Sequence, residues 1–178
     1  PVTYTSFSVF ESATSGLTTE NFDVAPWRPV GGKAQGLSNL GVSWTAANQL
    51  YASNISHSGS GSVSSNDGVG PGADIFDWVE AVLPANVTAV GAWITSHNMA
   101  HLTELLAYDA LNNLLGSVSL GNTGHAFAFL GLTTDTAIAR VRFPSTNVTN
   151  PIGADLTVDD FSFGPGGVSI PVRAPSWL

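Results

Sequence analysis

Short segments in which apolar and polar residues alternate recur along this chain, with turn-forming residues between them. Alternation with a period of two is the pattern of a β-strand that buries one face. The clearest such segments are 87–96, 102–108, 114–120, 125–130, 137–143 and 156–163. No segment keeps the period of an amphipathic helix for more than two turns, so the pattern predicts an all-β protein.

The first half of the chain contains fewer such segments. Residues 2–10, 40–46 and 75–83 predict strands, although the spacing in the third also fits a short helix. Residues 21–33 contain two prolines and a Gly-Gly pair, which predicts a loop. Residues 51–74 are dominated by Ser, Gly and Asn, so we expect a long, exposed and mobile loop there.

Nine or ten short strands at regular spacing predict an antiparallel β-sandwich of jelly-roll type. A length of 178 residues fits one domain with one core. We place this domain at residues 1–164, because Gly164-Pro165-Gly166-Gly167 interrupts the last strand pattern. Residues 165–178 then form an extended C-terminal tail.

The second half of the chain also carries a family resemblance. VTAVGAWI leads into LTELLAYDALNNLLGSVSL, then FAFLGLTTDTAIARVRF, then LTVDDFSFG. This succession resembles the secreted bacterial β-sandwich proteins that end in a Pro-Glu-Pro sorting signal, the PEP-CTERM proteins. The tail IPVRAPSWL resembles a degenerate form of that signal, without its central glutamate. The resemblance implies export, a location at the cell surface or in an exopolysaccharide matrix, and a jelly-roll-like domain. It supplies no catalytic residues.

Charged residues make up only 10% of the chain, and 5 Lys+Arg stand against 13 Asp+Glu, for a net charge of −8. Nucleic-acid binding needs clustered basic residues, which are absent, and an anionic membrane surface is disfavoured for the same reason. A cation such as Ca²⁺ fits this charge balance. A surface built from Ser, Thr, Asn and Gly is typical of extracellular β proteins and of surfaces that pack against copies of themselves.

Cysteine is absent, which excludes disulfides, Cys-based zinc sites and a thiol nucleophile. The chain begins at Pro1 without a signal peptide, so we expect a mature product from which a leader was removed. No apolar segment approaches the roughly 18 residues of a membrane span, and we expect none in this chain. We therefore predict a secreted protein of the cell surface or matrix.

The adjacent carboxylates Asp159 and Asp160 are the most suggestive candidates for metal binding. We expect the first and last strands to lie side by side, so that Glu11 and one of the two aspartates bind Ca²⁺; the candidate ligands are Glu11, Asp159 and Asp160. The alternative is that the pair only caps a strand end or forms a turn. On an alternating strand Asp159 and Asp160 would point to opposite faces.

Aromatic residues supply the candidate ligand-binding positions. Trp44 and Trp93 lie within strand patterns, so we expect them in the core. Trp27 and Tyr51 lie by loops, and we expect them to be exposed and able to stack on sugar rings. Exposed aromatic residues would equally suit contacts between subunits.

Catalytic motifs are weak. His97 and His101 are four residues apart but lack the glutamate of a zincin motif, and no G-x-S-x-G motif is present. Thirteen acidic residues without a motif do not define a glycosidase pair. We therefore expect a non-catalytic protein, and rank a hydrolase or metalloenzyme last.

The two ends of the chain are extended and nearly uncharged. Such arms can add a strand to the sheet edge of a neighbouring copy and so build filaments. The residues that we expect to mediate this self-association are Val2, Tyr4, Val168, Ile170 and Trp177. The leading hypothesis is thus a structural or adhesive surface protein that self-associates and is stabilised by calcium. The alternative is a carbohydrate-binding module that binds extracellular polysaccharide through loop aromatics.

Overall fold

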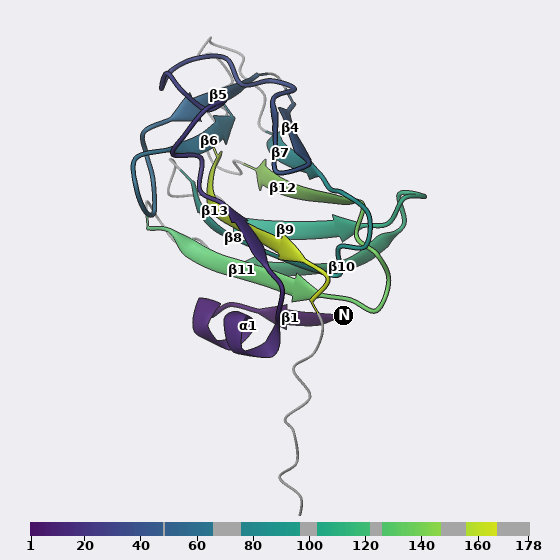
Figure 1. The fold of residues 1–178 in the computed structure, drawn as a ribbon. Coiled ribbons are helices and arrows are strands. Elements are labelled where there is room, and N and C mark those ends of the chain that lie inside the picture. The colour runs from purple at the N-terminus through teal and green to yellow at the C-terminus, as the bar shows by residue number, and fades with distance from the viewer. Residues whose placement is uncertain (48, 66–75, 97–102, 122–125, 147–155, 167–178) are drawn as a thin grey trace, which may run out of the picture.

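The structure is a computed structural model that describes residues 1–47, 49–65, 76–96, 103–121, 126–146 and 156–166. Within these ranges the chain forms two antiparallel sheets that enclose a hydrophobic core, with one short helix outside them, which confirms the predicted β-sandwich (Figure 1). The elements in chain order are β1 (Val2–Tyr4), α1 (Phe7–Ala13), β2 (Thr18–Glu20), β3 (Ser38–Asn39), β4 (Val42–Ala46), β5 (Leu50–Ser53), β6 (Ser62–Ser65), β7 (Phe76–Val82), β8 (Ala89–Ser96), β9 (Thr103–Tyr108), β10 (Leu114–Leu120), β11 (Ala128–Thr133), β12 (Arg140–Thr146) and β13 (Leu156–Gly164).

Sheet A has seven strands and sheet B has six. The order in sheet A is β1-β11-β8-β13-β6-β5, with β2 also paired to β13, and the order in sheet B is β10-β9-β12-β7-β4-β3. β13 therefore lies in the middle of sheet A, with β8 along one edge and β6 and β2 along the other.

The main core fills the space between the sheets. In β4, for example, Val42, Trp44 and Ala46 are buried, whereas the intervening Ser43 and Thr45 are only half-buried. The Trp44 ring meets the rings of Phe22 and Phe161 edge-on, with centroids 5.1 and 5.0 Å apart. The prediction that Trp44 is a core residue is confirmed.

A second, smaller cluster lies on the outer face of sheet A. Gly91 of β8 and Gly131 of β11 are directly paired, and the rings of Phe10 and Phe129 occupy the space above them. A Cβ atom at Gly131 would lie 2.9 Å from both rings, so only glycine allows this close approach. Helix α1 docks here through Phe7 and Phe10.

The prediction of one strand over residues 2–10 is wrong in its second half. β1 ends at Tyr4, and residues 7–13 form α1. Phe7 and Phe10 are three residues apart, which places both on one side of a helix but on opposite sides of a strand. Because both rings find partners above the glycine pair, packing favours the helix.

The prediction of one long exposed loop at 51–74 is wrong in its extent, because within the described part of this segment only residues 54–61 lie between strands. β5 and β6 form a hairpin at the edge of sheet A, with register Tyr51 to Ser64, and residues Ser62–Ser65 are buried. The connection, residues 54–61, is here called the pinned loop. Residues 66–75 lie outside the described residues.

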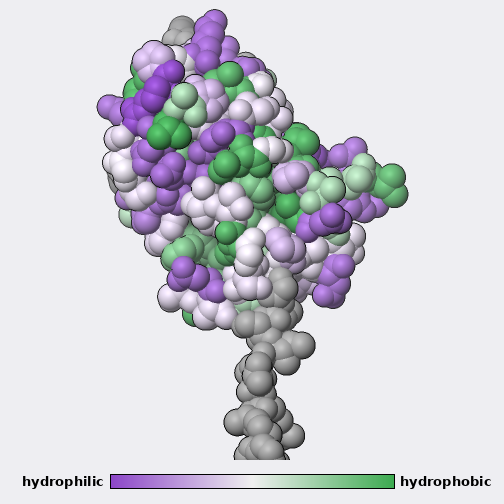
Figure 2. Space-filling view, viewed as in Figure 1, coloured by the Kyte–Doolittle hydropathy of each residue, from purple (hydrophilic) through white to green (hydrophobic). Residues whose placement is uncertain are grey.

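Much of the surface is neither strongly hydrophilic nor strongly hydrophobic, as expected from a chain with few charges (Figure 2). Hydrophobic residues appear in small groups among hydrophilic ones on the face shown. Among the described residues, no helix has the length and hydropathy to cross a bilayer.

Candidate functional site

The candidate site begins at a bulge in β13. Asp159 pairs with Trp93 of β8 and Ser162 pairs with Gly91, so two residues of β13 oppose one residue of β8. Asp160 adopts the left-handed conformation there, with φ of 45°. Such a bulge turns consecutive side chains toward the same side. The prediction that Asp159 and Asp160 point to opposite faces is therefore wrong, since both carboxylates meet the pinned loop.

Asp159 holds the backbone of the pinned loop. Its Oδ2 accepts hydrogen bonds from the N–H groups of His57 and Ser58, at 2.7 and 3.1 Å, and its Oδ1 accepts one from the N–H of Asp160 at 2.7 Å. Asp159 is fully buried, and this burial raises its pKa to about 6, with a further contribution from the charge of Asp160. The backbone N–H donors partly oppose the increase.

Asp160 holds the side chains of the same loop. Its Oδ2 lies 2.8 Å from Nδ1 of His57, and its Oδ1 accepts a hydrogen bond from Oγ of Ser58 at 2.9 Å. The His57 ring lies flat on Trp93, with centroids 3.8 Å apart and an angle of 9° between the planes. Phe127 meets the same ring edge-on at 5.8 Å. His57 is thus fixed both by a carboxylate and by two aromatic rings.

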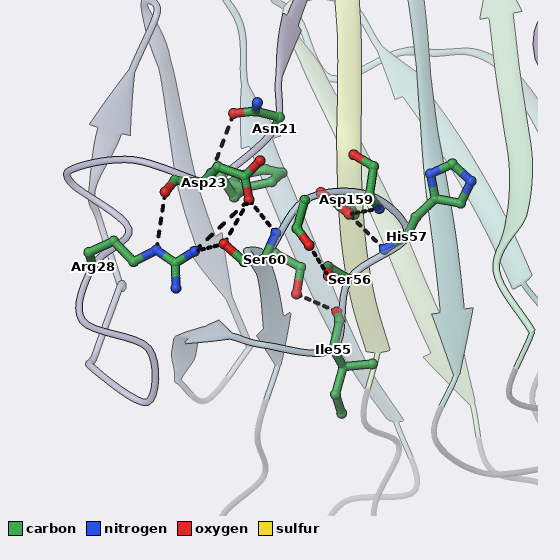
Figure 3. A network of polar contacts seen from close by, with 12 residues as sticks. Asn21, Asp23, Arg28, Ile55, Ser56, His57, Ser60 and Asp159 are labelled. Carbon is green, nitrogen blue, oxygen red and sulfur yellow. Dashed lines mark hydrogen bonds and ion pairs between the residues drawn. The ribbon is translucent and has the colours of Figure 1, made fainter.

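A second carboxylate fixes the far end of the pinned loop. Oδ1 of Asp23 accepts a hydrogen bond from the N–H of Ser60 at 2.6 Å, and Arg28 donates from Nε to the backbone oxygen of Asp23 at 3.1 Å (Figure 3). Arg28 also contacts the Ser60 hydroxyl. Two separate anchors, Asp23 and Asp159, therefore hold the far end and the centre of a short Ser- and Gly-rich loop.

A groove of about 550 Å³ lies beside Trp93 and next to α1. Its walls are aromatic: Phe7 from α1, Trp93 from β8, and Phe127 and Phe129 at β11. The groove is also lined by hydroxyl-bearing residues of the segment that precedes and starts α1, including Ser6 and Ser8. A groove lined both by aromatic rings and by hydroxyl-bearing side chains is amphipathic, and we call it the aromatic groove.

The structure does not gather the predicted calcium ligands in the way the sequence suggested. β1 pairs with β11 and not with β13, and Glu11 lies on the exposed side of α1. The first and last strands are therefore not neighbours, and Glu11 does not join Asp159 and Asp160. Within the described ranges, no group of three or more His, Cys, Asp or Glu side chains is placed to hold a metal. Calcium binding itself stays a prediction.

Neither of the two aromatic residues predicted to bind ligand is fully exposed. Trp27 is 1% exposed and packs edge-on against Phe22, so the prediction that it is exposed is wrong. Its loop folds back because the ring completes the core. Tyr51 is half-buried on β5, away from the aromatic groove.

The structure also tests the predictions made for Trp93, Val2 and Tyr4. Trp93 is half-buried on the outer face of sheet A and does not belong to the main core as predicted. Val2 and Tyr4 pair with Thr133 and Gly131 of their own sheet, so they are not a free arm. Val168, Ile170 and Trp177, like His97 and His101, lie outside the described residues.

The sequence did not predict His57 or Phe127 as residues next to a ligand-binding groove. One signal was available. Gly91 and Trp93 are two residues apart on β8 and therefore lie on the same side, so a residue without a side chain stands next to a large aromatic ring. The loop containing His57 offered no such signal, because its position depends on carboxylates that are 101 to 103 residues away.

Comparison with known proteins supports the fold. No protein-family model and no curated protein matches this chain. Among solved structures, the K2 cleaved adhesin domain of Lys-gingipain matches with a TM-score of 0.53 and 14% identity, over 84% of this chain and 99% of that domain. The K1 cleaved adhesin domain of Lys-gingipain from Porphyromonas gingivalis W83 matches with a TM-score of 0.51 and 14% identity, over 86% and 100%.

A carbohydrate-binding module, TmCBM61 in complex with β-1,4-galactotriose, matches more distantly, with a TM-score of 0.44 and 19% identity over 68% of this chain and 87% of that one. The two adhesin domains, at 14% identity, establish the sandwich architecture alone.

Proposed function

We propose that this domain is a non-catalytic, saccharide-binding adhesive domain that acts outside the cell and binds its ligand in the aromatic groove. The observation that carries the proposal is an open groove lined by aromatic rings and hydroxyl-bearing residues, next to an imidazole that is held in place. Ligand sites typically combine an apolar concave surface with a few fixed polar groups.

The groove suits a sugar ring because a pyranose has an apolar C–H face and polar edges. The C–H face would pack on Trp93 and Phe127, while Ser6 and Ser8 would exchange hydrogen bonds with ring hydroxyls. Asp160 favours the His57 tautomer that carries its proton on Nδ1, which leaves Nε2 as an acceptor for a ligand hydroxyl. Because His57 is already ordered, binding would cost little conformational entropy there.

The carboxylates of the site favour a structural role over catalysis. Both oxygens of Asp159 accept backbone N–H groups beneath the pinned loop, and both oxygens of Asp160 bind side chains of that loop. A general acid or base must reach the substrate. Neither carboxylate is positioned as an open catalytic group, although the pKa of Asp159 is raised.

The proposals that the domain is adhesive and that it acts outside the cell are supported by its fold and its composition. The chain shares its fold with two domains that are described as adhesin domains. Its composition, with few charges and no cysteine, is compatible with an exposed surface in a matrix rich in polysaccharide. Self-association remains a further element of this proposal, to be tested separately.

Affinity electrophoresis on gels that contain single polysaccharides tests the groove. We expect the native protein to be retarded on at least one gel, and Phe127→Ala to lose about tenfold in affinity, since an aromatic contact contributes about 1–1.5 kcal/mol. Leu111→Ala is the matched control, because Leu111 is 81% exposed at the β9–β10 turn and does not line the groove. Equal retardation of Phe127→Ala and the native protein would rule out the groove.

A further inference from the structure

The outer face of sheet B carries a second organised cluster of side chains. In β9 and in the parts of β7 and β12 whose side chains the structure describes, residues that alternate with the core residues point outward. Five of these outward residues form one contact network, here called the sheet B lattice: Trp78, Glu80, Tyr108, Arg140 and Arg142. This sheet is on the opposite side of the sandwich from the aromatic groove.

Glu80 is the centre of the lattice. Its Oε2 accepts hydrogen bonds from Nη1 of Arg140 at 2.6 Å and from Nε of Arg142 at 2.8 Å, and Nη2 of Arg142 lies 2.7 Å away. Glu80 is only 9% exposed, so this carboxylate is held firmly among its partners. Charge-assisted hydrogen bonds of this length fix the orientation of both guanidinium groups.

Each guanidinium group also lies over an aromatic ring. Cζ of Arg140 is 4.2 Å from the centroid of the Tyr108 ring, and Cζ of Arg142 is 4.3 Å from that of Trp78. Arg140 makes one more hydrogen bond, from Nη2 to Oδ1 of Asn112 at 3.1 Å. Stacking and hydrogen bonding together fix both guanidinium groups in place before any ligand binds.

The lattice keeps unused hydrogen-bonding groups. Nη1 of Arg142, Nε of Arg140 and Oε1 of Glu80 make no hydrogen bond to the part of the chain that the structure describes. Two of the chain's five basic residues, Arg140 and Arg142, therefore meet at one carboxylate on this face. Fixed donors next to a fixed acceptor are what neighbouring hydroxyls of a sugar require.

We propose that the sheet B lattice is a second saccharide-binding site, specific for a neutral, polyhydroxylated chain that lies across β7, β12 and β9. The guanidinium groups would donate to ring oxygens and hydroxyls, and Glu80 would accept from a hydroxyl. The exposed parts of the two rings and of Leu106 would contact apolar C–H groups. This site does not depend on the aromatic groove.

The charge of the face favours a neutral ligand over an acidic one. The two arginines share Glu80, and Glu104 of β9 is a second carboxyl group on this outward side, whose pKa is raised by burial. The local balance is therefore close to neutral, and the chain as a whole has a net charge of −8, which repels a polyanion.

If the aromatic groove also binds saccharide, which rests on the proposed function above, the domain has two sites on opposite faces. One molecule would then bridge two glycan chains, and a long polysaccharide would bind many molecules at once. Bivalent attachment raises the overall strength of binding without any new contact. Adhesion would follow from this arrangement alone.

The test measures the affinity of the full chain for soluble neutral polysaccharides by isothermal titration calorimetry. We expect Arg142→Ala to weaken binding at this site about tenfold, the effect of losing one or two hydrogen bonds from a charged group. Arg142→Lys, which keeps the charge but loses the planar stack, should also weaken it. Lys33→Ala is the control, because it removes a positive charge elsewhere on the molecule. Thermal melts would show that each variant is folded.

The outcomes separate the two sites. Loss of affinity in Arg142→Ala with retention in Phe127→Ala would support the lattice and overturn the groove. Loss in Phe127→Ala with full affinity in Arg142→Ala would overturn the lattice and leave the groove intact. Binding to polyuronates alone would overturn the assignment of a neutral ligand. Where both sites bind, native protein should cross-link a long polysaccharide and either variant should not.

Discussion

At the scale of single residues, Asp159 has the largest consequence. A carboxylate without access to solvent is expensive to keep ionised, and here it is retained because it accepts three backbone N–H groups. No alternation pattern in the sequence shows this. The sequence pointed to Asp159 and Asp160 as a chemically important pair, but their part in ordering the pinned loop depends on the bulge and on a loop distant along the chain.

Asp159 should make stability depend on pH with an unusual sign. Its folded pKa of about 6 is above the ordinary value of 3.8, so the folded state binds this proton more tightly than the unfolded state does. Ionised Asp159 therefore destabilises the fold above pH 6, and this cost, about 3 kcal/mol, disappears as pH falls toward 3.

Comparison with Asp159→Asn isolates this effect from other titrating groups. Urea unfolding at a series of pH values should show that the stability of the Asn variant relative to the native protein is highest above pH 6. It should then decrease by about 3 kcal/mol between pH 7 and 3. A difference that does not change with pH would show that Asp159 titrates normally.

The paired glycines make a second prediction at the residue scale. Gly131→Ala would place a Cβ 2.9 Å from Phe10 and Phe129, so one ring must move, and we expect a loss of about 1–3 kcal/mol in unfolding free energy. Gly121→Ala is the matched control, since no described atom lies within 4 Å of the position that its methyl group would take. Equal stability of the two variants, measured by denaturant unfolding, would contradict the close packing.

At the scale of elements, strands were easier to predict than the helix. The turn between β9 and β10 is where the sequence placed it: Asp109 accepts hydrogen bonds from the N–H groups of Leu111 and Asn113 at 2.8 Å, and Asn112 has a φ of 65°. These are local interactions, which a short sequence window contains. Helix α1 has seven residues, too few for a stable isolated helix, so its formation depends on tertiary packing that no window contains.

The docking of α1 should depend on one of its faces. Phe10→Ala removes a fully buried ring and should lower the unfolding free energy by about 3–5 kcal/mol. Val9→Ala, on the exposed side of the same helix, should change it by less than about 0.5 kcal/mol. Thermal or denaturant unfolding measures both, and similar losses in the two variants would mean that α1 is not docked as described.

At the scale of the whole molecule, the two sheets differ in their outer faces: that of sheet A is covered by other parts of the chain, and that of sheet B is more open. Helix α1 and the pinned loop lie over the outer face of sheet A, whereas the outward residues of sheet B meet solvent more directly. Alternation in the sequence predicted both sheets, because each has a buried inner face. It did not predict which outer face would be covered, since that depends on Asp23 and Asp159 holding a loop that is poor in apolar residues.

Self-association is a prediction at this scale. β1 is the edge strand of sheet A and has its own partner in β11, so the expected route is the C-terminal segment. Sedimentation velocity should show high-mass species that disappear when residues 168–178 are removed. An unchanged size distribution after that truncation would contradict assembly through the tail.

The place of β13 in sheet A also has a consequence for the order of folding. The last strand of the described chain is a central one, and its neighbours β8, β6 and β2 all precede it. A chain still emerging from a ribosome or a translocation channel therefore lacks the middle of one sheet until β13, Leu156–Gly164, has emerged. Pairing over such long separations is slow, and the half-formed sheet would expose two strand edges. The pinned loop, whose anchor is on β13, can close only after this step, so an incomplete chain would not present a finished groove.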